Sequence, residues 1–243
     1  MKRNYPWKVQ KFKINSLGRD FVAGDIHGEF EVLEKALEQL NFDYEVDRLF
    51  CVGDLIDRGP QSARVAEFLY YKWFNSIAGN HEWMLYNCHD DKKFSHSLWY
   101  PNGGGWWDGI TQAARDNIVG SVQSMLYALI TVQTPAKQFG LVHALSCPYY
   151  SWPEFCQKIG HDQVLQQWAL WERDYQAYAY KTVDGIDLIF CGHTPMNEVH
   201  RFSNFINIDT GCGHRSSHWL SQPALTIVEL SESLTFYQFP TAK

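Results

Sequence analysis

The sequence lacks the features that mark a secreted or membrane-bound protein. Its six cysteines form no CxxC pair and two of them fall inside apolar runs, so we expect reduced thiols that pack as small hydrophobic side chains. No apolar run approaches the ~20 residues of a membrane span, and the start, MKRNYPWKVQKFKIN, has no uninterrupted apolar stretch for a signal peptide. These absences predict a cytoplasmic protein without a membrane segment.

The chain also lacks an excess of positive charge. With 21 Lys and Arg against 27 Asp and Glu, the formal net charge of −6 repels polyanions, so extended nucleic-acid binding would need a local basic patch. We expect the single basic cluster to be a leader that packs on the body, and we assign no nucleic-acid partner. This leader contains Lys2, Arg3, Lys8, Lys11 and Lys13, with Tyr5, Trp7, Phe12 and Ile14 among them.

Length and composition are those of a globular protein. The chain has 243 residues, of which 45% are hydrophobic and 20% charged, and this size can bury a substantial core. Internal repeats and Ser/Pro-rich linkers are missing, so we expect residues 1–243 to form a single domain. The 10 Trp, 13 Tyr and 15 Phe suit a core of large side chains or a groove walled by rings.

Short runs of β-branched and aromatic residues predict strands, with helices between the early ones. Two amphipathic helices are expected, one over residues 29–40 and one after Pro60. This alternation, followed by strands alone, predicts an α/β fold with its chemistry in loops at the carboxyl ends of strands. The expected strands are 20–24, 48–53, 75–79, 127–132, 139–143, 187–192, 205–209, 225–230 and 234–239.

Candidate metal ligands gather in five short segments, each directly after an expected strand. Each segment alone has an ordinary explanation, because Gly-Asp after a strand is usually a turn and a buried histidine is usually a core residue. Several such strings in order at strand ends favour a shared site. The segments are GDIHG at 24–28, GDLIDRG at 53–59, GNHE at 79–82, LVH at 141–143 and CGHT at 191–194.

The residue types in these segments suit two divalent ions. Asp25 and His27 are one residue apart and can reach one ion from a turn, while Asp54 can bridge two ions through its two oxygens. This mixture of oxygen and imidazole ligands favours Mn, Fe or Zn over Ca. Two ions ~3.5–4 Å apart can share a hydroxide and clamp a phosphoryl group for in-line attack. The set is completed by Asn80, His143 and His193.

Together, GDIHG, GDLIDRGP, GNHE, LVHA and FCGHT resemble the signature segments of the calcineurin-like metallophosphoesterases, specifically the phosphoprotein phosphatase family. NGGGWW at 102–107 and LWER at 170–173 are similar to its phage-lambda and bacterial branch. The resemblance implies a four-layer αββα sandwich and two divalent ions, with Mn favoured and Fe or Zn as alternatives. It also implies one ion on Asp25, His27 and Asp54, and the other on Asp54, Asn80, His143 and His193.

The resemblance further implies the roles of the remaining residues. Arg58 and Arg173 would clamp phosphate oxygens, a task suited to the planar fork of a guanidinium, and Asn80 would also contact the phosphate. The Asp57–His81 pair would supply a proton to the leaving alkoxide. A seryl oxygen leaves poorly without a proton, and an imidazole held protonated by a carboxylate can donate one near neutrality.

Several assignments stay open at this point. Arg173 could instead be a surface residue paired with Glu172 or Asp174. After His143 the chain reads Ala-Leu-Ser-Cys, where the bacterial branch more often continues Ala-Asp, so the groove on that side can differ. Trp106 and Trp107 suit either a substrate cleft or packing that pins a loop. No role is assigned to His89, His96, His161, His200, His214 or His218.

The sequence therefore predicts a serine/threonine-type phosphoprotein phosphatase that attacks phosphoprotein or phosphopeptide substrates directly with a metal-bridging hydroxide. The nearest alternative is a hydrolase of small phosphorylated molecules such as diadenosine tetraphosphate, although DRGP followed by GNHE favours the phosphatase. A nuclease or cyclic-nucleotide esterase is disfavoured because Gly192-His193 continues with Thr194-Pro195 and not as Gly-His-x-His. A non-catalytic scaffold would lack a ligand or the Asp–His pair. Phosphotyrosine preference and oligomeric state stay open.

Overall fold

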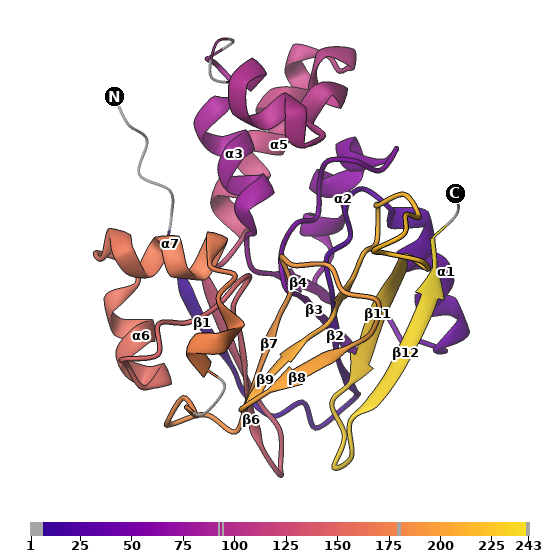
Figure 1. Ribbon diagram of the computed structural model, residues 1–243. Helices are drawn as coiled ribbons and strands as arrows, with labels where there is room; N and C mark the ends of the chain where they lie inside the picture. Colours follow the sequence, from indigo (N-terminus) through magenta and orange to yellow (C-terminus); the bar gives the residue numbers. More distant parts are fainter. Residues whose placement is uncertain (1–6, 92, 94, 179–180, 242–243) are drawn as a thin grey trace.

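The computed structural model describes residues 7–91, 93, 95–178 and 181–241. In this part of the chain, two six-stranded sheets pack face to face and helices cover both outer faces (Figure 1). These layers are the four-layer αββα sandwich that the sequence predicts, and the fold prediction is confirmed. Among the described residues, no helix combines the length and the apolar character that crossing a membrane requires.

The first sheet collects strands from the N-terminal leader and the second half of the chain. In spatial order it contains β1 (Val9–Phe12), β5 (Leu129–Gln133), β6 (Gln138–Leu141), β7 (Leu188–Cys191), β9 (Phe205–Asn207) and β8 (His200–Phe202). The strands β6, β7 and β9 run parallel to one another. The leader does pack on the body, as edge strand β1 paired with β5, while Lys2, Arg3 and Tyr5 lie outside the described residues.

The second sheet is built on three adjacent parallel strands. Its spatial order is β10 (Asp209–Thr210), β11 (Ala224–Glu229), β2 (Asp20–Ala23), β3 (Arg48–Cys51) and β4 (Phe74–Ser76), and β12 (Thr235–Pro240) pairs along β11. The expected strands ran past β2, β3, β4 and β7 by one to three residues. Each expectation ended on a glycine of the following loop: Gly24 and Gly192 come directly after their strands, Gly53 comes two residues beyond β3 and Gly79 three residues beyond β4.

Helices cover the two outer faces unequally. The second sheet packs with α1 (Phe30–Gln39), α2 (Val65–Tyr70), α3 (Asn80–Cys88) and α5 (Gln112–Met125), and the first with α6 (Trp152–Lys158) and α7 (Gln163–Trp171). Helix α1 buries the face expected from its periodicity, with Leu33, Ala36 and Leu37 inside. Helix α3 escaped prediction because the polar residues of its first turn, Asn80, His81 and Glu82, are themselves buried.

The core between the sheets explains the continuous apolar character of the central strands. On β2 and β3, Val22 and Phe50 face the first sheet, whereas their neighbours pack toward the helices. Phe139 and Phe190 approach from the first sheet with ring centroids 5.7 Å apart. Because both faces of these strands are buried, alternation of polar and apolar residues is absent.

Phe50 tests this arrangement because it is fully buried and its ring lies 4.9 Å from that of Phe12 on the opposite sheet. Replacing Phe50→Ala should lower the free energy of unfolding by ~3–5 kcal/mol through lost burial and a cavity. Urea denaturation followed by circular dichroism measures this change. The control is Leu17→Ala, at a side chain that is 80% exposed, with an expected change within ~0.5 kcal/mol. Similar losses in both variants would contradict the inter-sheet position of Phe50.

Candidate active site

The predicted metal ligands follow strands of both sheets and meet at one edge. Asp25 and His27 follow β2 and Asp54 follows β3, while Asn80 opens helix α3. From the first sheet, His143 follows β6 and His193 follows β7. All six side chains are buried. The carboxyl ends of the parallel strands thus bring together every ligand expected from the sequence.

One group of ligands is formed by Asp54, His143 and His193, whose donor atoms lie within 4.8 Å of one another. Asn80 joins them, with its Oδ1 2.9 Å from His143 Nε2 and 2.8 Å from His193 Nδ1. His143 Nδ1 donates to the Val52 carbonyl at 2.8 Å, so in neutral His143 the Nε2 lone pair faces the Asn80 oxygen. Imidazole nitrogens and oxygens grouped at these distances fit a divalent ion.

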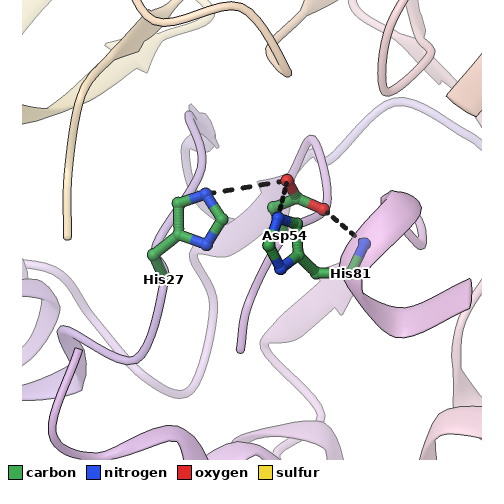
Figure 2. A group of neighbouring side chains, drawn as sticks. All are labelled: His27, Asp54 and His81. Carbon is green, nitrogen blue, oxygen red and sulfur yellow. Dashed lines mark hydrogen bonds and ion pairs between the residues drawn. The ribbon is translucent and has the colours of Figure 1, made fainter. Parts of the chain in front are cut away.

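The second group contains His27, Asp54 and His81 (Figure 2). His27 Nε2 lies 3.6 Å and His81 Nε2 3.7 Å from Asp54 Oδ2, so Asp54 belongs to both groups. The backbone carbonyl of Ile56 accepts from His27 Nδ1 at 2.9 Å, so in neutral His27 the lone pair that could bind an ion is on Nε2, which here accepts from Arg58. Asp25 Oδ2 lies 3.9 Å from this nitrogen. The second group also fits a divalent ion, with His81 facing it as well as Asp25.

Buried charge at this edge supports the same conclusion. Burial, together with the charges of Asp209 and Asp54, raises the pKa of Asp25 well above its ordinary value, and burial raises the pKa of Asp209 to about 6. Burial also opposes ionisation of Asp54, but His143 and His81 hold its pKa well below the ordinary value. Carboxylates that crowd in this way without a compensating cation are costly, and a divalent ion removes the cost.

The histidine ligands differ in their tendency to hold a proton. Burial and the nearby Arg58 charge lower the pKa of His27 well below its ordinary value, and burial and His143 do the same for His193. Burial would also lower the pKa of His143, but the Asp54 carboxylate 3.3 Å away outweighs it and raises that pKa. His27 and His193 are therefore neutral, as metal ligands must be.

The backbone of the site is strained and tightly packed. Five candidate residues have positive φ without being glycine, namely His27 at 45°, Asp54 at 48°, Asp57 at 74°, Arg58 at 68° and His193 at 71°. Such conformations are costly and persist only where surrounding contacts enforce them. A Cβ at Gly79 would overlap Asp54 Oδ1, and one at Gly192 would overlap Asp25 Oδ1. Glycine at these two positions gives the carboxylates their space.

Glu82 enforces the conformation of the Asp54 loop. Its buried carboxylate accepts from the backbone N–H groups of Asp54 at 3.0 Å, Leu55 at 2.8 Å, Ile56 at 3.2 Å and Gly79 at 2.8 Å. The sequence marked Glu82 as part of GNHE but assigned it no role. Its contribution depends on a loop 26 to 28 residues away and on burial, neither of which a motif reveals.

The predicted acid pair and both arginines border the ligand cluster. His81 Nδ1 donates to Asp57 Oδ2 at 2.6 Å, and His81 Nε2 points into the cluster. The Arg58 guanidinium donates to His27 Nε2, and Arg173 Nε donates to His193 Nε2 at 3.1 Å. Glu172 accepts instead from the backbone N–H of Arg173 at 2.8 Å, so the Arg173 guanidinium is turned toward the cluster.

Other side chains at this edge were left without a role by the sequence. The ring of His214 lies 5.8 Å from that of His27, and its Nε2 has no hydrogen-bond partner within the described structure. Trp107 packs in the core, whereas Trp106 and Trp99 donate hydrogen bonds to Asp57. In the sequence, the row of glycines before Trp106 is the one feature that indicates this close packing around Asp57.

Two arginines beside a cluster that fits two divalent ions are suited to a phosphate ester, which defines the class of the protein as a metal-dependent phosphoesterase. The family model of the calcineurin-like phosphoesterases matches residues 21–197. The chain belongs to this family.

Comparisons with individual proteins place the chain among several kinds of phosphoesterase. It is 32% identical to serine/threonine-protein phosphatase 2 of Salmonella typhimurium (strain LT2), over 79% of this chain and 86% of that protein. It is 40% identical to the symmetrical bis(5'-nucleosyl)-tetraphosphatase of Hamiltonella defensa, but over only 29% of this chain and 26% of that protein. A crystal structure with the provisional name diadenosine tetraphosphatase shares the fold, with a TM-score of 0.66 at 19% identity over 97% of this chain and 99% of that one.

The raised pKa values of Asp25 and Asp209 predict that metal stabilises the protein more as pH rises. When folding raises the pKa of a carboxyl group, the protonated group stabilises the folded state. This stabilisation is complete below the ordinary pKa of about 4, and it is lost as the pH rises through the folded-state pKa, which is about 6 for Asp209. An ion bound beside Asp25 would favour the charged form of both carboxylates and so would take the place of these protons. The increase in Tm on adding Mn²⁺ should therefore be larger at about pH 7.5 than at about pH 5.

Thermal denaturation with Mn²⁺ or with a chelator at both pH values measures this difference. Asp54 belongs to both ligand groups, so Asp54→Asn should lose most of the increase at each pH. Equal increases at the two pH values, or a full increase in Asp54→Asn, would contradict the assignment.

Proposed function

We propose that this protein is a metal-dependent phosphoprotein phosphatase of the serine/threonine type. The observation that carries the proposal is the hydrogen bond of 2.6 Å between His81 Nδ1 and Asp57, with His81 Nε2 turned into the ligand cluster. A seryl or threonyl alkoxide is a poor leaving group that needs a proton, whereas a nucleotide leaves as a phosphate with far less need of one. A carboxylate-bound imidazole at this position therefore supports hydrolysis of alkyl phosphate monoesters.

The proposed metal centre uses the ligands that meet at the edge of the two sheets. We assign Asp25, His27 and Asp54 to one ion and Asn80, His143 and His193 with Asp54 to the other. Mn is favoured, and Fe or Zn is compatible with the same oxygen and imidazole donors. When bound, these ions supply an activated water and positive charge for the phosphoryl oxygens.

The remaining residues bind and orient the substrate. Arg58 and Arg173 reach the cluster beside His27 and His193, so together they can hold the phosphoryl group from two sides. Asn80 is proposed to contact the phosphate as well. His81 donates a proton from Nε2 to the departing oxygen, and Asp57 holds the imidazole in the orientation that this requires.

We also infer that residues 1–243 form one phosphatase domain, because strands from the leader and from both halves of the chain share the core between the sheets. The likeness to the Salmonella protein phosphatase over 79% of the chain supports a phosphoprotein or phosphopeptide as substrate. A cytoplasmic location agrees with the free state of its six cysteines.

Hydrolysis of diadenosine tetraphosphate is the second candidate function. It is favoured by the 40% identity to a symmetrical tetraphosphatase, although that likeness covers 29% of the chain. The two candidates differ in the group that leaves, an alkoxide in one and a nucleotide in the other, so substrate comparison separates them.

The first test compares substrates for the metal-loaded protein. A panel of phosphoserine, phosphothreonine and phosphotyrosine peptides should be hydrolysed with higher kcat/KM than diadenosine tetraphosphate. A chelator should abolish turnover and added Mn²⁺ should restore it, because the buried carboxylates cannot bind phosphate without the ions. Released phosphate and nucleotide products measure both activities. Preferential hydrolysis of the dinucleotide would reverse the assignment, and undiminished turnover by metal-free protein would falsify the metal-dependent mechanism.

The second test uses the leaving group to probe His81. His81→Asn should suppress hydrolysis of a phosphoserine peptide by ~10²-fold or more, but hydrolysis of an aryl phosphate far less, since a phenolate leaves without a proton. Arg58→Ala should reduce both activities similarly because it weakens binding of the common phosphoryl group. The measurement is kcat/KM for both substrates at saturating Mn²⁺, with metal content checked. Equal losses in His81→Asn would remove the acid role from this residue.

A further inference from the structure

The Asp57 carboxylate is held by three N–H donors. Oδ2 accepts from His81 Nδ1 at 2.6 Å and from Trp99 Nε1 at 2.8 Å, and Oδ1 accepts from Trp106 Nε1 at 2.6 Å. The side chain is fully buried. Because both oxygens are engaged from different directions, the plane of the carboxylate is fixed and not merely its position.

The backbone of Asp57 makes these outside contacts necessary. Asp57 and Arg58 have φ values of 74° and 68°, which non-glycine residues adopt only when neighbouring groups enforce them. The Asp57 N–H donates to Ser62 Oγ at 2.9 Å, which restrains the main chain but leaves the carboxylate free to rotate. The two indoles supply the restraint that the backbone does not.

Glycines in the segment from Ser95 to Gly109 allow the two indoles to approach Asp57 closely. Gly103 has a φ of 110°, and a Cβ there would lie 2.7 Å from the backbone nitrogen of Arg58. This glycine therefore lets the segment pack against the turn at Asp57 and Arg58. A Cβ at Gly104 would lie 2.6 Å from the Trp99 indole nitrogen. A Cβ at Gly105 would meet nothing within 4 Å. The first two glycines are therefore required by the indole arrangement and the third is not.

We propose that Trp99 and Trp106 are positioning residues that hold the Asp57 carboxylate in the one orientation in which it can align His81 for proton donation. This inference rests on the proposed role of His81 as the acid. With an indole N–H removed, the carboxylate can rotate or bind water, and His81 Nε2 loses its fixed direction toward the ligand cluster. Within the described residues each indole N–H donates to Asp57, so we expect the arginines and the metal ligands to keep their arrangement when it is removed.

The chain offers a matched control for each change. Trp99→Phe and Trp106→Phe remove one N–H each and keep an aromatic ring. Trp107→Phe removes an indole N–H that has no hydrogen-bond partner in the part of the chain described, although its ring packs 5.5 Å from both Trp99 and Trp106. Gly104→Ala, which displaces the Trp99 indole, is matched by Gly105→Ala in open space.

The expected result is a selective loss of the step that needs a proton. Trp99→Phe and Trp106→Phe should lower kcat for a phosphoserine peptide by ~10–100-fold, the range found when a supporting hydrogen-bond partner is removed. Hydrolysis of an aryl phosphate should fall by less than ~3-fold, with KM and Mn²⁺ content unchanged. Trp107→Phe should change both substrates by the same factor. Gly104→Ala should show the selective loss and Gly105→Ala should not.

Side-chain NMR gives a second measurement that does not require activity. With diamagnetic Zn²⁺ bound, the indole N–H resonances of Trp99 and Trp106 should shift in Asp57→Asn, while that of Trp107 should stay. Resonances of Trp99 and Trp106 that do not move would overturn the hydrogen bonds on which the inference depends.

The outcomes separate this inference from the proposed function. If His81→Asn shows the leaving-group bias but Trp99→Phe and Trp106→Phe behave as Trp107→Phe does, the positioning role is wrong and the acid role stands. If His81→Asn shows no bias, the acid role fails and the inference fails with it. Bias in all three of His81→Asn, Trp99→Phe and Trp106→Phe supports both.

Discussion

The carboxylates of Asp25, Asp54 and Asp209 are buried together where the two sheets meet. The groups around them offset the free-energy cost of removing these charges from water. Charge removed from water must be balanced by hydrogen bonds, by opposite charge or by protonation. Here Asp54 accepts from the first turn of helix α3, at the His81 N–H, and lies between histidines of both sheets. Divalent ions would complete the balance, and their binding would then be coupled to the stability of this edge.

The same constraint explains why strain concentrates at this edge. The loop after β3, which buries the Asp54 and Asp57 carboxylates, has positive φ at Asp54, Asp57 and Arg58. Neither helix nor sheet hydrogen bonds hold such turns. Backbone hydrogen bonds from the loop after β2, such as that from the His27 N–H to the Asp54 carbonyl, hold them, together with side chains. Glu82 accepts four N–H groups around the Asp54 loop, and Trp99 and Trp106 donate to Asp57.

What the sequence predicts well is what local chemistry determines. Strand ends carrying Gly-Asp and Gly-His strings were recognisable because several of them occur in order after expected strands, and their meeting at one edge follows from parallel strands. Helix α1 followed from periodicity. The Trp99–Asp57 contact spans 42 residues and the Asp209 carboxylate follows β9 without a motif around it, so neither leaves a local pattern. Helix α3 was hidden because function, not amphipathic packing, sets the residues of its first turn.

The division between shared chemistry and substrate choice follows from the same geometry. In the proposed mechanism the metal ligands and the arginines contact only the phosphoryl group, so the same set can serve a protein phosphatase or a nucleotide hydrolase. Discrimination must come from groups that meet the leaving side. In the proposed mechanism one such contact is the acid His81, which favours substrates with a poor leaving group, and its alignment is inferred to depend on the Ser95–Gly109 segment through Asp57. The ring of Trp171 also lies beside the cluster, with its centroid 6.2 Å from that of His193. Under the proposed function, substrate preference therefore depends both on the acid pair within the strings at 53–59 and 79–82 and on the Ser95–Gly109 segment outside them.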